Sequence, residues 1–184
     1  MGKSLRRFGE RLKSTVTAMQ SVPDSIFQGQ ESRTARGLRQ NLQELLEHSS
    51  LTPEESGLAL LAIATGVEHD ALVHYARERL AALRVSLERM QQAAESAAVM
   101  GMLNVYYSFR EVLRKDEEYG PPRLRGQVES DMLGFALSVL NGCEPCIVGH
   151  EQALRDAGVG VEKIHDLAKL AAVVKGLKTL SAIA

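Results

Sequence analysis

The sequence predicts an all-α protein, and three observations support this. Apolar residues make up 45% of the 184-residue chain, and they are mostly Ala, Leu and Val, of which Ala and Leu are strong helix formers. No segment has the alternating apolar and polar pattern of a half-buried strand. Signals for helix starts and stops recur instead, most clearly where Thr52 can cap a helix that ends at Gly66, in "SSLTPEESGLALLAIATG".

The expected elements follow these signals in order. Pro53 suits the first turn of the capped helix, and Glu55 lies three residues after the cap, as in a capping box. The polar, glycine-bearing segment "FQGQESRTARG" predicts a loop, and the main break is predicted at "KDEEYGPPRLRGQ", which has two prolines and two glycines. Helices are expected over residues 4–20, 35–47, 53–66, 69–87, 88–103, 104–114, 128–140, 143–157 and 161–183.

A weak internal repeat suggests how these helices are organised. Residues 55–74 can be laid on residues 131–150 with a constant offset of 76, and "ERMQQAAESAAVM" resembles "EKIHDLAKLAAVV" at an offset of 74. Two such helical units could bury their apolar faces against each other. Only the second unit has cysteines, so the first is expected to be scaffold. We expect an N-terminal helical extension over residues 1–34 and a single helical domain over residues 35–184. Within this domain, the degenerate first half is expected over about 35–115 and the redox-active second half over about 128–184.

The charge balance argues against two classes of partner. The net charge is −1 at pH 7, so no overall basic field favours nucleic acid. Basic residues gather in the first 13 positions, but no apolar core of a secretory signal follows them, and we interpret them as the solvated face of a helix. No run approaches the ~18 apolar residues of a membrane span. We expect a cytoplasmic protein that binds neither nucleic acid nor membrane.

The two cysteines of the chain lie together in "NGCEPCIVGHE". Gly142 is typical of a helix end, so a new helix is expected to begin near Cys143, with Pro145 tolerated in its first turn. A helix N-terminus favours thiolate over thiol. Because Cys146 is three residues after Cys143 and His150 four residues further on, all three side chains are expected on one helix face. An imidazole placed there can accept a thiol proton.

The spacing leaves three kinds of site open. The first is a redox centre, with a carboxylate behind the histidine from Asp131, Glu129 or Glu144. The second is a zinc site formed by the two cysteines, the histidine and Asp131 or His165, although structural zinc usually draws on a second cysteine or histidine pair. The third is an inert thiol pair beside a core histidine. Covalent haem is excluded because isoleucine follows the second cysteine, and a thioredoxin fold lacks its βαβ context.

The chain resembles the alkyl hydroperoxide reductase D (AhpD) family, within the carboxymuconolactone decarboxylase-like group. The shared pattern is an acidic residue, eleven further residues and then Cys-x-x-Cys-x-x-x-His. "FALSVLNGCEPCIVGHEQALRDAGV" carries this resemblance, "AAVMGMLNVYYSF" adds to it, and it covers about residues 35–182. It implies an all-helical fold of two related halves, usually a homotrimer, without a bound cofactor or metal. It also implies a thiol-dependent peroxidase that regenerates a partner peroxiredoxin with electrons from a dihydrolipoyl group on a lipoylated protein.

The resemblance also implies a role for each site residue. Cys146 would be the reactive thiol that becomes a sulfenic acid, and Cys143 the resolving thiol and proton donor that closes a disulfide with it. His150 would be the base of the proton relay. Asp131 stands where the family normally has a glutamate, so its shorter side chain requires either a bridging water or a closer helix. The alternative is a non-peroxidase member of the group, either a small-molecule enzyme or a helical assembly protein.

Overall fold

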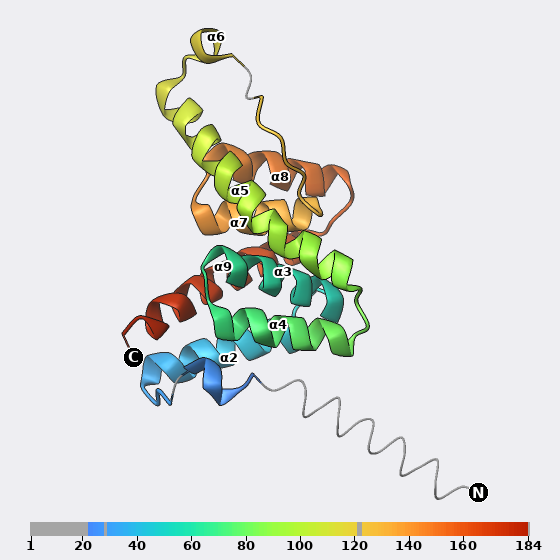
Figure 1. Ribbon diagram of the computed structural model, residues 1–184, viewed down its shortest axis with the longest axis vertical. Helices are drawn as coiled ribbons and strands as arrows, with labels where there is room; N and C mark the ends of the chain where they lie inside the picture. The colour runs from blue at the N-terminus through green and yellow to red at the C-terminus, as the bar shows by residue number, and fades with distance from the viewer. Residues whose placement is uncertain (1–21, 28, 121–122, 184) are drawn as a thin grey trace, which may run out of the picture.

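Within the residues that the computed structural model describes, 22–27, 29–120 and 123–183, every regular element is helical (Figure 1). The all-α prediction is therefore confirmed. The predicted helix over residues 4–20 lies outside the described residues. In chain order the elements are η1 (Asp24–Phe27), α2 (Arg33–Glu47), α3 (Pro53–Gly66), α4 (Asp70–Ala82), α5 (Leu87–Leu113), α6 (Asp116–Tyr119), α7 (Asp131–Asn141), α8 (Glu144–Asp156) and α9 (Val161–Ser181).

Helix α3 lies at the centre of the fold. Residues 56–64 are buried without exception, and α3 packs against α2, α4, α5, α7 and α9. A helix that is apolar all round is stable only when it is enclosed by others. Its start is capped as predicted, because Thr52 Oγ1 accepts the N–H of Glu55 at 3.2 Å and Glu55 Oε2 accepts the N–H of Thr52 at 2.7 Å.

Helix α5 corrects one prediction, since the segments expected over 88–103 and 104–114 form one continuous helix. Asn104 lies at the expected junction. Its side chain is buried and its Nδ2 donates to the carbonyl oxygen of Leu137 in α7, at 3.2 Å. An asparagine that is bonded to a neighbouring helix does not compete for the backbone of its own helix. The helix therefore continues to Leu113, and its outer half runs beyond the rest of the fold towards α6 (Figure 1).

Other boundaries differ from the predictions as well, and near three of them a serine caps the helix that follows. The helix expected from residue 35 begins two residues earlier, at Arg33, because Ser32 Oγ accepts the N–H of Ala35 at 3.0 Å, so the predicted loop is wrong for residues 33 and 34. The helix expected to reach residue 87 ends at Ala82, and Ser86 caps α5. The helix expected from residue 128 begins at Asp131, after the cap Ser130.

The helix bounds also bear on the register of the internal repeat. Glu68 and Gly142 are both left-handed residues at a helix end, with φ of 56° and 68°, and they lie 74 residues apart. Helices α4 and α8 begin 74 residues apart, as do α5 and α9. From the turn onwards the helix bounds therefore fit an offset of 74 rather than 76. The pairing of Glu55 with Asp131 stays a prediction. The division into two related halves stays a prediction.

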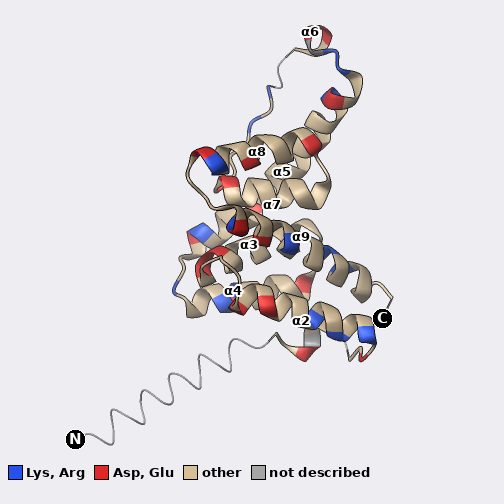
Figure 2. Cartoon of the chain, turned by 180° about the vertical axis from the view of Figure 1, so that it is seen from behind, with Lys and Arg blue, Asp and Glu red and all other residues tan. Residues whose placement is uncertain are grey.

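The described surface carries both signs of charge. In the view of Figure 2, acidic and basic residues are interspersed along the helices, and the net charge of the chain is −1. Among the described helices, none is both long and apolar enough to cross a membrane.

Candidate functional site

The turn between α7 and α8 positions both cysteines. Gly142 adopts φ 68°, which glycine reaches without steric cost, and its N–H contacts the carbonyl oxygen of Val139 at 3.2 Å. The N–H of Cys143 then donates to the carbonyl oxygen of Ser138, at 3.1 Å. This closure ends α7 and makes Cys143 the residue before α8, with Pro145 in the first turn. The predicted helix start at the cysteines is confirmed.

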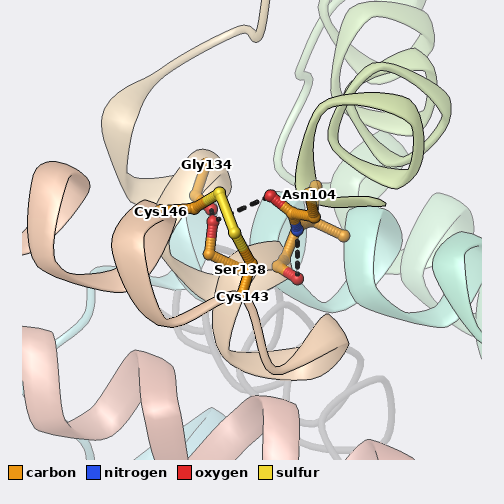
Figure 3. The surroundings of a disulfide bond; sticks show 6 residues. Asn104, Gly134, Ser138, Cys143 and Cys146 are labelled. Atoms are coloured by element: carbon orange, nitrogen blue, oxygen red, sulfur yellow. Dashed lines mark hydrogen bonds between the residues drawn. A yellow bond between two sulfur atoms is a disulfide. The ribbon is translucent and has the colours of Figure 1, made fainter. Parts of the chain in front are cut away.

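Cys143 and Cys146 form a disulfide, with their Cα atoms 5.3 Å apart (Figure 3). The two residues differ in exposure, since Cys143 is completely buried and Cys146 is only partly buried. Cys146 lies in the first turn of α8, where unpaired N–H groups and the helix dipole favour a thiolate once the disulfide is reduced. A reactant from solvent therefore meets the sulfur of Cys146 first.

A buried polar pair lies beside the disulfide, between α5 and α7 (Figure 3). Ser138 Oγ donates to the carbonyl oxygen of Gly134 at 2.7 Å and lies 3.4 Å from Asn104 Oδ1. Both side chains are almost inaccessible to solvent, and together they join the two helices. Sequence reasoning missed this pair, although a serine and an asparagine inside apolar helical segments were a usable signal, because buried polar groups need partners.

His150 is in direct contact with Asp131, with 3.0 Å between Nδ1 and Oδ1. The imidazole belongs to α8 and the carboxylate to the first turn of α7. The shorter acid therefore reaches the histidine without a bridging water. The contact fixes one ring nitrogen as the partner of the carboxylate and leaves the other, Nε2, for chemistry.

The other candidate acids lie elsewhere. Glu129 Oε1 accepts from Nε of Arg89 at 2.9 Å, which ties the chain before α7 to α5. Glu144 is exposed at the start of α8. His165, considered as a zinc ligand, is exposed on α9. In the described part of the chain, no group of three or more His, Cys, Asp or Glu side chains is arranged to hold a metal ion.

A cavity of about 440 Å³ opens over these residues. Cys146, His150 and Asp131 line it together, so the thiol, the base and the acid predicted from the sequence face one space. The rest of the lining is mainly apolar and comes from α5 and α8: Met100, Leu103, Tyr107, Pro145 and Gly149. A small organic molecule that enters the cavity would have its apolar part against α5 and its polar end near the sulfur.

The chain is similar to known proteins over most of its length. Residues 126–184 match the carboxymuconolactone decarboxylase family. The protein named alkyl hydroperoxide reductase AhpD from Rhizorhabdus wittichii is 36% identical over 161 residues, which cover 82% of this chain and 92% of that protein. The proteins of the same name from Streptomyces coelicolor and Anaeromyxobacter dehalogenans are 36% and 34% identical, over 78% and 76% of this chain and 85% and 80% of their own length.

Proposed function

The chain belongs to the alkyl hydroperoxide reductase AhpD family, and from this premise we propose that it is a peroxidase whose redox centre is the Cys143–Cys146 pair. One observation supports this most directly. The cavity brings together a partly buried cysteine that can open and close a disulfide, a histidine and a carboxylate bonded to that histidine. The disulfide form corresponds to the enzyme after it has reduced a peroxide.

In the peroxide-reducing half of the cycle, His150 takes the proton of the Cys146 thiol, and the imidazolium is stabilised by Asp131. The thiolate attacks the terminal oxygen of the hydroperoxide, so an S–O bond forms while the O–O bond breaks. The departing alkoxide takes the proton of the Cys143 thiol and leaves as an alcohol. The new Cys143 thiolate then attacks the sulfenic acid on Cys146, and the expelled hydroxide leaves as water with the proton from His150.

The second half of the cycle restores the thiols. A dihydrolipoyl dithiol gives two electrons and two protons to the Cys143–Cys146 disulfide and becomes a cyclic disulfide itself. The reduced pair can then reduce either a peroxide or the disulfide of a partner peroxiredoxin. The lipoylated reductant and the peroxiredoxin follow from the family resemblance and are part of this proposal, as is the cytoplasmic location.

The exposed side of α5 supports the proposed homotrimer. Met102, Val105, Phe109 and Val112 lie three or four residues apart, so they form one stripe on the outer half of the helix, and they are 38%, 73%, 43% and 81% exposed. Apolar stripes of this kind are usually covered by another helix. We propose that a second copy of the chain covers it. Val105→Glu and Val112→Glu should then convert a trimer into monomers in light scattering coupled to gel filtration, and a wild type that is already monomeric would contradict this.

The experiment that tests the function follows thiol oxidation in the reduced protein. Addition of one equivalent of cumene hydroperoxide should consume both thiols and yield the Cys143–Cys146 disulfide by mass spectrometry, and dihydrolipoamide should reverse it. Cys146→Ser should lose peroxide consumption entirely. A Cys146→Ser protein that still consumes peroxide would overturn the mechanism.

The match of residues 126–184 to the decarboxylase family supports a second candidate. In that case the chain acts on a small carbon acid, or is an assembly protein, and its cysteines have no redox role. Thiols that remain unchanged after treatment with peroxide and with oxidised lipoamide would favour this candidate over the peroxidase.

A further inference from the structure

The His150 ring lies directly on the backbone of α7, at Gly134. A Cβ atom placed on Gly134 would lie 2.4 Å from Cε1, 2.7 Å from Nε2 and 2.8 Å from Nδ1 of the ring. Real Cβ atoms essentially never approach other atoms so closely, because carbon contacts are optimal at about 3.5–4.0 Å. The imidazole therefore occupies the space that any side chain at position 134 would need.

Backbone conformation does not explain this glycine. Gly134 lies inside α7, outside the left-handed region, and glycine in a helix interior is less favourable than alanine. A glycine here has a cost, and the three atoms nearest to an added Cβ all belong to the His150 ring.

The helix cannot move away from the ring to make room. Leu133, Phe135 and Leu137 of α7 are all buried in the core, and the carbonyl oxygen of Leu137 accepts a hydrogen bond from Nδ2 of Asn104 in α5, at 3.2 Å. Well-packed cores resist such shifts. With a Cβ at position 134, the rigid ring would have to retreat from α7 by about 1 Å to reach a normal contact distance.

The retreat would break the contact between histidine and acid. Asp131 lies three residues before Gly134, so its carboxylate lies on the same face of α7, and its Oδ1 is 3.0 Å from Nδ1. An added 1 Å takes this distance out of the hydrogen-bonding range. A glutamate side chain is longer than an aspartate side chain by one C–C bond, about 1.5 Å. This added length is close to the displacement of the ring.

We propose that Gly134 is a positioning residue for the proton relay: its missing side chain brings His150 close enough for an aspartate to act where a glutamate would otherwise be needed. Gly134 and Asp131 are then a matched pair, a small residue with a short acid. The catalytic part of this inference rests on the proposed function, whereas the steric part does not.

The steric part is tested by thermal unfolding, without any activity. Gly134→Ala should lower the melting temperature when His150 is present, by several degrees. In a His150→Ala background the same substitution should leave the melting temperature unchanged or raise it, because the space is free and alanine favours the helix. Gly37→Ala is the matched control, since Gly37 lies in α2 with nothing within 4 Å of an added Cβ. An equal effect of Gly134→Ala in both backgrounds would overturn the proposal.

The relay part is tested by rescue. Gly134→Ala should slow both the reaction of the reduced protein with cumene hydroperoxide and the alkylation of Cys146 by iodoacetamide, each about tenfold. Asp131→Glu, added to Gly134→Ala, should recover most of both rates, although Asp131→Glu alone should give no gain. A folded Gly134→Ala protein with wild-type rates, or one that Asp131→Glu does not rescue, would refute the proposal. If the wild type does not react with peroxide, the peroxidase proposal fails, while the alkylation rates and the melting temperatures still decide this one.

Discussion

Replacement of Asp131 by asparagine removes the negative charge behind His150 and keeps the size of the side chain. The Nδ1–Oδ1 distance is 3.0 Å, at which two unit charges attract each other by about 1.4 kcal/mol under bulk-water screening and by about 5.5 kcal/mol at an effective dielectric constant of 20. The Asp131 side chain is 56% exposed, so the lower value applies. Because about 1.4 kcal/mol corresponds to a factor of ten in rate, we expect Asp131→Asn to slow thiol oxidation about tenfold.

The assay is a single turnover of the reduced protein with cumene hydroperoxide, followed by loss of free thiol in a stopped-flow instrument. Glu151→Gln is the matched control, because it removes one negative charge beside His150 in the sequence, from a glutamate whose side chain is 43% exposed and whose Oε1 lies 4.0 Å from Nε of Arg155. It should react at the wild-type rate. If Asp131→Asn oxidises at a rate within twofold of the wild type, Asp131 is not the relay acid. If both variants lose the same fraction of the rate, the effect comes from net charge and not from the contact with His150.

Three further outcomes are expected. Cys143→Ser should leave a sulfenic acid on Cys146 after one equivalent of peroxide, seen as a dimedone adduct by mass spectrometry; a protein without the adduct would contradict the assigned roles. Burial lowers the pKa of His69; a hydrogen bond with its own backbone raises this pKa in part, and the charge of Lys178 lowers it. The unfolded chain therefore binds the proton more tightly than the folded protein, so stability falls as the pH falls through the usual histidine range. His69→Asn keeps an acceptor for the N–H of Leu72 and should weaken this loss in urea titrations at pH 8 and pH 5.5, whereas an unchanged pH dependence would exclude His69 as its source. Leu61→Ala, at the centre of α3 and fully buried, should cost about 2–5 kcal/mol of unfolding free energy in the same titrations, and a cost below about 1 kcal/mol would show that α3 is not the centre of the core.

Local sequence signals predicted most of the helices. The capping box at Thr52 and the glycine at position 142 act within a few residues of their own position, so their effect can be read without knowledge of the fold. The predictions are wrong where a serine caps the helix earlier than expected, as at Ser32, and at the boundary expected before Asn104, where α5 is continuous. The partner of Asn104 is 33 residues away in the chain, and no local pattern indicates it.

The histidines illustrate the same limit. His69 and His74 both lack partners at metal-ligand spacing in the sequence, but they occupy different environments. His69 is buried, and its Nδ1 accepts the N–H of Leu72 at the start of α4. His74 lies on the surface, 3.2 Å from Glu78. The residue type alone does not predict whether a histidine is buried, because burial depends on the residues that pack over it.

Local signals predict most of the helices and the order of the reactive groups along α8, because caps, glycine stops and the spacing of Cys143, Cys146 and His150 act within one or two helical turns. Whether those groups meet an acid is a matter of tertiary packing. That depends on the distance between α7 and α8, and the distance depends on Gly134, a residue without a side chain that no chemical motif singles out. Asp131 reaches His150 because two helices approach closely at this glycine, and only the packing of the whole fold sets that approach.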